Sequence, residues 1–213
     1  MNTVLIIGAS RGIGLETVKL ALKAGHSVRA LSRSATTIRL HDPKLEKLDG
    51  DALDRDTIER ALVGVDAVIQ TLGVSSAPEL IFSGTRLFSA ATRVLVNAME
   101  ARAVRRLICV TGFGAGDSRG RGGLLYNAAL CLFLGRVYAD KDVQERIIRR
   151  SRLDWTIVRP TILTNRPRTG AYRVLVDPRD WTSGSISRAD VADFLVAQID
   201  DASLLHKTPT LTG

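Results

Sequence analysis

An apolar run that leads directly into three spaced glycines is the feature that most constrains this fold. Residues 3–7 read Thr-Val-Leu-Ile-Ile, and Gly8, Gly12 and Gly14 follow them. In a strand–turn–helix unit, the first glycine permits a tight turn, the second lets a diphosphate approach, and the third lets the helix lie close to the sheet. The helix N-terminus then offers free N–H groups to an anion. We therefore predict a dinucleotide diphosphate site made by Gly8, Ser10, Arg11, Gly12, Ile13 and Gly14.

Segments with the apolar pattern of strands alternate with helical segments along the chain. The predicted strands cover residues 3–7, 27–31, 45–48, 67–69, 107–111 and 155–158. The predicted helices cover residues 12–24, 54–63 and 85–102, and a last helix follows Ser187. Such alternation gives right-handed βαβ units and a parallel sheet with helices on both faces. The predicted fold is therefore α/β, a doubly wound parallel sheet of the NAD(P)-binding Rossmann type, in a single domain over residues 1–213.

Length and composition fit one compact domain, for which we expect a cytoplasmic location. The chain has 213 residues, 45% of them hydrophobic, which allows a single large core. It contains no apolar run near the roughly 20 residues that cross a bilayer, and Met1 leads directly into the first strand without a signal peptide. Cys109 and Cys131 lie in apolar segments, as core cysteines do, and no residue set is predicted to bind a metal.

The net charge of +8 allows two interpretations. A basic surface attracts nucleic acid, and it equally attracts an anionic cofactor or substrate. Many of the basic residues are arginines on or beside predicted helices, without interleaved aromatic residues: Arg93, Arg102, Arg105, Arg106, Arg146, Arg149, Arg150 and Arg152. This pattern favours solvated helix faces over nucleic-acid binding. We expect a small-molecule partner, anionic or aromatic, and a monomer or homodimer.

The residues after the second predicted strand favour NADP over NAD. A site selective for NAD carries a carboxylate there, which binds the ribose 2′-hydroxyl. This chain has Ser32, Arg33 and Ser34 instead. The Arg33 guanidinium group can donate two parallel hydrogen bonds to a 2′-phosphate. The two serine hydroxyls can donate to the same phosphate, and Arg11 adds positive charge. The alternative is an ordinary surface arginine at a strand end.

Five motifs together are similar to one superfamily. They are residues 8–14, the Gly50-Asp51-Ala52 turn, residues 107–116, residues 154–160 and residues 187–193. On these motifs the chain resembles the atypical short-chain dehydrogenase/reductase superfamily. Within it, the chain is similar to the NAD(P)H-binding branch that contains the flavin reductase biliverdin reductase B. The likeness covers nearly the whole chain and includes residues 169–172, which resemble the C-terminal part of that enzyme.

The resemblance implies residues for the remainder of the cofactor. On the adenosine half they are Asp51, Ala52, Leu72 and Gly73, with the Asp51 carboxylate accepting from the adenine amine. On the nicotinamide half they are Thr111, Gly112, Pro160, Thr161 and Ile162. Each follows the carboxyl end of a predicted strand, where ligands bind in open α/β sheets.

The catalytic pattern of the active dehydrogenases, Tyr-x-x-x-Lys, is only partly present. Lys141 and Glu145 fit the lysine and a downstream glutamate on one helix face, but Val137 occupies the tyrosine position. Tyr138 comes one residue later, which rotates it by about 100° around the helix and predicts a packing role away from the lysine face. Thr111 and Lys141 are the candidate catalytic residues. Lys141 either holds the nicotinamide ribose or is a solvated surface lysine.

The elements expected to face the substrate are residues 112–135 and 160–186. The first range includes a glycine-rich loop with Arg119 and Arg121, which either contacts an anionic substrate or has no bound partner. It also includes the apolar segment 124–134, for which we expect a buried helix, a pocket wall or a subunit contact. The spacing of Ser187 and Asp190 resembles a capping box before the last helix, and we interpret it as structural.

Two functions remain open. The first is an NADPH-dependent reductase that transfers a hydride to a flavin, a quinone or a similar conjugated acceptor without a tyrosine acid. The second is a non-catalytic redox sensor of the same superfamily that binds NADP. Biliverdin reductase B has a histidine near the Ile162 position, which this chain lacks, since its histidines are His26, His41 and His206. The chain is too short for the usual substrate domain of a sugar-nucleotide epimerase.

Overall fold

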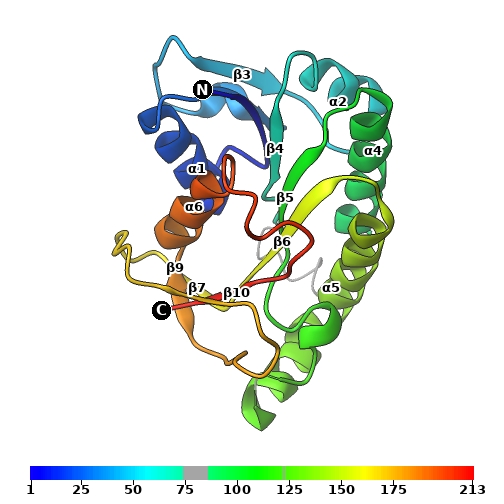
Figure 1. The fold of residues 1–213 in the computed structure, drawn as a ribbon, viewed down its shortest axis with the longest axis vertical. Coiled ribbons are helices and arrows are strands. Elements are labelled where there is room, and N and C mark those ends of the chain that lie inside the picture. Colours follow the sequence, from blue (N-terminus) through cyan, green and yellow to red (C-terminus); the bar gives the residue numbers. More distant parts are fainter. Residues whose placement is uncertain (74–85, 122) are drawn as a thin grey trace.

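A single sheet with helices on both faces forms the core of the protein (Figure 1). The computed structural model describes residues 1–73, 86–121 and 123–213. The first half contains β1 (Thr3–Ile7), α1 (Gly12–Lys23), β2 (Ser27–Ser32), η1 (Ala35–Thr37), β3 (Leu45–Asp49), α2 (Arg55–Ala61), β4 (Ala67–Gln70) and α4 (Leu87–Ala101). The second half contains β5 (Arg106–Val110), η2 (Gly116–Ser118), α5 (Leu124–Arg150), β6 (Asp154–Pro160), β7 (Ile162–Thr164), β8 (Arg173–Leu175), β9 (Ser185–Ser187), α6 (Arg188–Ala197) and β10 (Thr210–Thr212).

The strand order confirms the predicted doubly wound fold. The eight-stranded sheet runs β3-β2-β1-β4-β5-β6-β10-β8, and every pair in it is parallel except β10 with β8. A separate two-stranded parallel sheet joins β7 to β9. The order reverses between β1 and β4, and ligands of open α/β sheets bind at the carboxyl ends of the strands beside such a reversal.

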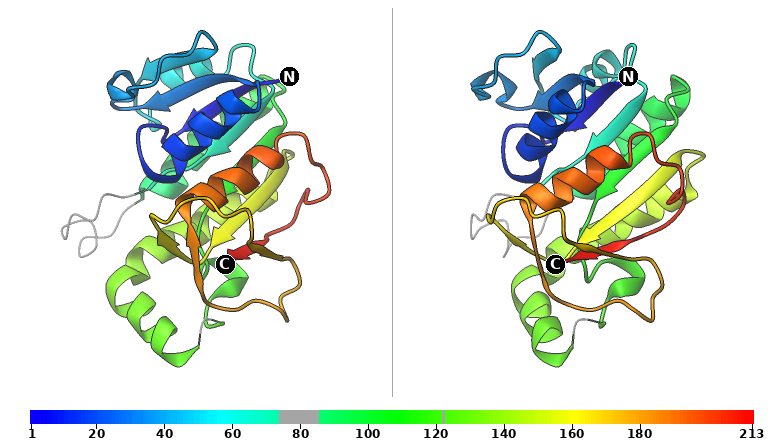
Figure 2. Two further views of the ribbon diagram at one scale, coloured as in Figure 1. Left: turned by 90° about the vertical axis from the view of Figure 1, so that its left-hand side faces the viewer. Right: turned by 60° about the vertical axis from the view of Figure 1, so that its left-hand side comes forward.

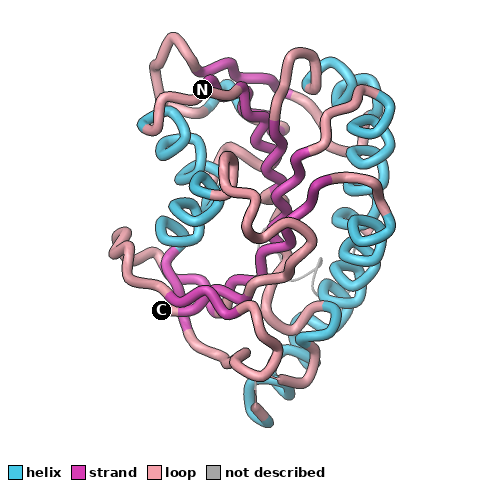
Figure 3. Tube along the Cα trace, viewed as in Figure 1, coloured by secondary structure: helices cyan, strands magenta, loops and turns pink. Residues whose placement is uncertain are grey.

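Two apolar layers hold the helices on the sheet. One face packs on α1 and α6 through residues such as Val18, Ile6 and Leu195, and the other packs on α2, α4 and α5 through residues such as Ile58 and Leu95. Figures 2 and 3 show α1 and α6 together on one side of the strands and α2, α4 and α5 on the other. Each layer buries the apolar stripe of its helices, which is the main source of stability in such a fold.

Most predicted elements match the structure within a few residues, but the strands β7 and β9 were not predicted, and two further regions differ. Residues 200–213 carry no predicted element, yet β10 lies beside β6 in the sheet, so His206 belongs to an ordered approach to that strand. The His206 N–H donates to the Trp155 carbonyl at 2.7 Å. The apolar segment 124–134 and the helix of Lys141 form one helix, α5. The side chains of residues 124–133, Cys131 among them, lie outside the described residues.

No helix in the described ranges is both long and apolar enough to pass through a lipid bilayer. Cys109 is buried in β5 as a free thiol, and burial raises its pKa to about 12. This thiol is therefore protonated at neutral pH and behaves as a core side chain.

Gly14 lies where α1 packs against the loop after β1. A Cβ at this position would overlap the Gly8 carbonyl oxygen and would lie 2.6 Å from Thr71 Oγ1. Because the Gly8 carbonyl group belongs to the backbone, this clash cannot be relieved by a rotamer change. The third glycine of the motif is thus fixed by close packing of helix on strand, as the sequence predicts.

We expect Gly14→Ala to lower the free energy of unfolding by about 2 kcal/mol, because an added methyl group overpacks a rigid backbone contact. Urea denaturation followed by circular dichroism measures the change. Gly135→Ala is the matched control, because an added Cβ at Gly135 in α5 would meet no described atom within 4 Å apart from the backbone of its own helix. This control should be stabilised by up to about 1 kcal/mol through helix propensity. Equal stability of the two variants would contradict the close-packing argument.

Candidate cofactor site

The loop between β1 and α1 has the geometry of a diphosphate cradle. Gly8 and Gly12 have φ angles of +87° and +57°, which residues other than glycine rarely adopt. The first turn of α1 has no acidic residue, and the Arg11 side chain does not cap it. Among the described residues, a Cβ on Gly12 would meet only Arg188, at 3.8 Å. The helix N-terminus is therefore open and electropositive, which fits an anionic group at Gly12.

Backbone hydrogen bonds bring the first three strand ends together. The Gly8 N–H donates to the Leu31 carbonyl of β2 at 2.9 Å, and the Gly50 N–H donates to the Ser32 carbonyl at 3.0 Å. The predicted residues Gly8, Ser32 and Asp51 thus lie at one edge of the sheet. The sequence predicted a common edge because each residue follows the carboxyl end of a strand, and the register of β1, β2 and β3 brings these ends together.

The residues after β2 are open to solvent. Arg33 and Ser34 are exposed, and the Ser34 N–H donates to Ser32 Oγ at 3.2 Å, which leaves the Ser32 hydroxyl free to donate. Asp49 of β3 is the register partner of Ser32. Its carboxylate accepts from the Thr36 N–H at 2.9 Å and from the Thr36 hydroxyl at 2.7 Å, and these bonds lower the pKa of Asp49. Arg33 has no carboxylate partner in the described ranges.

The remaining residues predicted for adenosine follow β3 and β4. Asp51 is exposed, and one of its carboxylate oxygens accepts from the Leu53 N–H at 3.0 Å. Ala52 is buried, Leu72 is half-buried and Gly73 is exposed. One Asp51 oxygen thus holds the local turn and the other stays available to a donor.

Lys141 belongs to α5, and its side chain is buried against the end of β5. Its Nζ donates to the Thr111 carbonyl at 2.8 Å and lies 4.2 Å from the centre of the Phe88 ring. The alternative of a solvated surface lysine is therefore wrong, since only 8% of Lys141 is exposed. Burial lowers the pKa of Lys141 to about 8. The adjacent Asp140 carboxylate accepts from the Phe88 N–H at 2.9 Å at the start of α4.

Tyr138 does not face away from Lys141, and this part of the prediction is wrong. A Cβ on Gly112 would lie 2.7 Å from the Tyr138 hydroxyl oxygen, so this hydroxyl lies against the end of β5. A residue three positions before Lys141 is about 60° away from it around the helix, which is still the same face. Val137, in the usual tyrosine position, is buried.

A buried ion pair joins α5 to β6 beside these residues. Arg159 Nε lies 2.9 Å from Glu145 Oε1, and Arg159 Nη2 lies 2.5 Å from Glu145 Oε2. Glu145 also accepts from the Thr111 hydroxyl at 2.9 Å, and Arg159 pairs with Asp117 of η2 at 2.5 Å. Burial acts to raise the pKa of Asp117, but the charge of Arg159, its hydrogen bond and the charge of Arg149 together outweigh burial and hold that pKa below its ordinary value.

Sequence reasoning gave Arg159 no role, although one signal was present. A charged residue in an otherwise apolar strand requires a buried partner, because an unpaired charge inside a protein is strongly unfavourable. Arg159 is fully buried in β6. The helical spacing of Glu145 was noted, but no pattern in the sequence indicates that the two residues meet.

The three residues predicted to close over the nicotinamide differ in how exposed they are and in which strand they bond to. Pro160 is buried at the end of β6, and its carbonyl accepts from the Phe113 N–H at 3.0 Å. The Thr161 hydroxyl donates to the Leu211 carbonyl at 3.1 Å, which ties it to β10. Ile162 is 56% exposed although it is apolar. An exposed isoleucine at this edge of the sheet is available to cover an aromatic ring.

A cavity of about 460 Å³ lies beside the diphosphate loop. Gly12 and Glu16 of α1 line it on one side, and Asn165, Arg166, Arg168 and Arg188 line it on the other. In the sequence, Arg188 was assigned only to a predicted helix cap.

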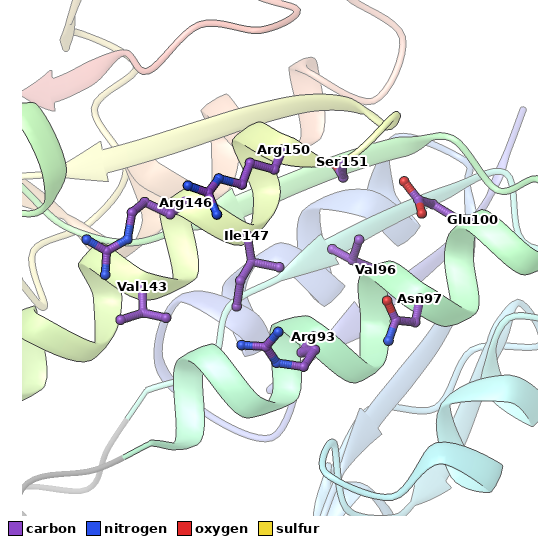
Figure 4. A pocket seen from close by; sticks show the side chains of 9 residues that line it. All are labelled: Arg93, Val96, Asn97, Glu100, Val143, Arg146, Ile147, Arg150 and Ser151. Atoms are coloured by element: carbon purple, nitrogen blue, oxygen red, sulfur yellow. The ribbon is translucent and has the colours of Figure 1, made fainter.

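A second cavity, of about 340 Å³, lies between α4 and α5 and contains none of the predicted cofactor residues. Figure 4 shows that Arg93 projects into it from α4 and Arg146 and Arg150 from α5.

The fold and the open loop at Gly12 define an α/β protein with a dinucleotide-type diphosphate site. The profile of the NAD(P)H-binding family matches residues 8–202. The chain belongs to this NAD(P)H-binding family. The uncharacterized sugar epimerase YhfK of Bacillus subtilis (strain 168) is 29% identical over 98% of this chain and 93% of its own length. A protein of Arabidopsis thaliana, At2g34460, described as chloroplastic, is 31% identical over 91% of this chain and 70% of its own length.

Solved structures agree with this assignment. ChuY of Escherichia coli O157:H7, described as an anaerobillin reductase, is 25% identical, with a TM-score of 0.80 over 99% of this chain and 96% of that chain. A short-chain dehydrogenase/reductase of Veillonella parvula DSM 2008 in complex with NADP has a TM-score of 0.81 over 100% of this chain and 94% of that chain. At 17% identity, this second likeness shows the fold alone.

Lys141 gives the protein a predictable pH dependence. Its pKa is about 8 in the folded state and 10.5 ordinarily, so between these values the unfolded chain holds a proton that the folded protein has released. Below pH 8 the buried charge of Lys141 lowers the free energy of unfolding. As the pH rises from 8 toward 10.5, the folded protein no longer carries this charge, and the free energy of unfolding increases again. Relative to Lys141→Met, the wild type should gain on the order of 3 kcal/mol over this range.

Urea denaturation of both proteins at pH 7, 8, 9 and 10 measures this difference. Lys23→Met is the control, because Lys23 is exposed at the end of α1. For the control, the difference from wild type should stay constant with pH. A constant difference for Lys141→Met as well would contradict the buried position of this lysine.

Proposed function

We propose that this protein is an NADPH-dependent reductase that transfers a hydride to a small conjugated acceptor such as a flavin or a quinone. The observation that carries the proposal is the uncovered backbone at Gly12, on the first turn of α1, at the same sheet edge as Lys141 and Thr111. A bound nicotinamide nucleotide supplies the hydride. The reductase description of ChuY, a structural relative, supports the same class of reaction.

The preference for NADP rests on charge at the end of β2. Arg33 is exposed and has no carboxylate partner in the described part of the chain, and Arg11 is exposed on the neighbouring loop. The Asp49 carboxylate is occupied by Thr36, so its hydrogen-bonding capacity is largely used. A phosphate between two unpaired guanidinium groups gains charge-assisted hydrogen bonds that a hydroxyl cannot form.

Residues of this chain would hold the reactive end of the nucleotide rather than supply strong acid catalysis. Lys141 is a buried donor at the end of β5 and can exchange its bond to the Thr111 carbonyl for bonds to ribose hydroxyls. Glu145 keeps Thr111 in place through its hydroxyl. A conjugated acceptor takes a hydride at an electron-poor atom, and water can deliver the proton, so position is the main contribution of the protein.

A redox sensor without turnover is the second candidate. The buried Val137 in the tyrosine position of the active dehydrogenases favours it. Such a sensor requires the same nucleotide site, so binding alone does not separate the two functions.

Turnover separates them. The protein is mixed with NADPH and with a panel of flavins, quinones and enones, and the nicotinamide absorbance is followed. We expect oxidation of NADPH with at least one acceptor, and slower oxidation of NADH because Arg33 favours the 2′-phosphate. Tight nucleotide binding without oxidation by any acceptor would favour the sensor, and no binding of either nucleotide would contradict both functions.

The variant Tyr138→Phe tests the class of acceptor. For a conjugated acceptor we expect its kcat to stay within about threefold of wild type, because no strong acid is needed. Loss of a general acid typically costs about a hundredfold or more. A loss of that size, largest at high pH, would identify Tyr138 as a proton donor and would favour a carbonyl substrate.

A further inference from the structure

Arg188 lies against the diphosphate loop although it is far away in sequence. It is the first residue of α6, and its Cδ and Nε atoms lie 3.8 Å from where a Cβ on Gly12 would be. The two helices α1 and α6 pack along each other on one face of the sheet (Figure 2). Their first residues therefore come together at the same edge, and the Arg188 side chain is half-buried between them.

The charge of Arg188 is not compensated by the protein. Within the described ranges it forms no ion pair, and its one side-chain hydrogen bond runs from Nη1 to Asn165 Oδ1 at 2.7 Å. The acid in the first turn of α6, Asp190, is occupied, because it accepts from the Ser187 hydroxyl and from the N–H groups of Thr169 and Gly170. The Nε and Nη2 groups of Arg188 keep their hydrogen-bonding capacity.

The position is unfavourable for a cation in the folded protein itself. A positive side chain at the start of a helix opposes the helix dipole, and here α1 adds a second positive helix end without an acidic residue. A residue that breaks a local rule without a compensating contact points to a functional role. An anion at Gly12 would attract both Arg188 and the helix N-termini, and these attractions would offset the repulsion between them.

We infer that Arg188 binds the diphosphate of the nicotinamide nucleotide at Gly12, and that Asn165 orients its guanidinium group. The inference rests on the proposed function, since it assigns one more residue to the same nucleotide. Asn165 follows β7, so its hydrogen bond joins the segment after β7 to the nucleotide site. The diphosphate is common to NADP and NAD, which separates this role from that of Arg33.

Calorimetric titration of NADP and NAD into the wild type and four variants tests the inference. We expect Arg188→Ala to weaken both nucleotides by a similar factor, about tenfold or more, because a charge-assisted contact with the shared diphosphate is lost. Arg33→Ala should weaken NADP by about tenfold and leave NAD nearly unchanged, because only NADP carries the 2′-phosphate. Arg166→Ala is the matched control, since Arg166 lines the same cavity and carries the same charge.

The control should change either affinity by less than about twofold, because Arg166 is exposed and the field of an exposed charge is screened by salt. Arg188→Lys, which keeps the charge but loses the planar fork, should be intermediate. Without nucleotide, the melting temperature of Arg188→Ala should equal or exceed that of wild type, because a cation is removed from a helix start. This readout excludes misfolding as the cause of weaker binding.

Each contrary result identifies a different error. If wild type binds neither nucleotide, the proposed function fails together with this inference. If wild type binds and Arg188→Ala binds equally well, only the role of Arg188 fails. Loss of NADP binding alone would place Arg188 at the 2′-phosphate, and an equal loss in Arg166→Ala would reduce the effect to general electrostatic attraction. Either outcome overturns the inference as stated.

Discussion

The buried pair of Arg159 and Glu145 is the interaction on which the arrangement of the sheet edge depends. Arg159 is fully buried in β6, and Glu145 on α5 is 2% exposed. Removing one member of such a pair leaves an uncompensated buried charge, at a cost of about 3–5 kcal/mol. The pair therefore fixes where α5 lies against β5 and β6. Since Lys141 and Tyr138 are on the same face of α5, it also fixes their position at Thr111 and Gly112.

The two ends of this edge differ in how their charges are balanced. Near β5 and β6, carboxylates within the protein act on the cations: Arg159 pairs with Glu145 and Asp117, and the Glu145 and Asp140 carboxylates attract Lys141. Near α1, among the described residues, no acidic side chain lies in the first turn of the helix, and the one side-chain hydrogen bond of Arg188 goes to a neutral amide. Positive charge that the protein does not neutralise is the electrostatic pattern of an anion site. This asymmetry supports a nucleotide bound with its diphosphate on α1.

Local patterns were sufficient to predict most of the fold. Apolar runs such as residues 3–7 and 107–111 predicted the central parallel strands, because buried strands of such sheets are apolar on both faces. The strand β10 was missed, because Thr210–Thr212 has no such pattern and becomes a strand only by pairing with β6 and β8. Tyr138 was misplaced by comparison with a fixed motif, although its three-residue spacing from Lys141 already placed both on one helix face. The roles given to the predicted site residues remain predictions.

The sequence by itself determined the class of fold and the diphosphate loop, because three glycines after a buried strand act through neighbouring backbone atoms. It also carried the family membership, since the match extends over residues 8–202. Only the tertiary structure decided which distant residues meet: Arg159 with Glu145 in the interior, and Arg188 with Gly12 at the sheet edge. The physical reason is that these contacts depend on how the helices pack on the sheet. No local spacing in the chain encodes that arrangement.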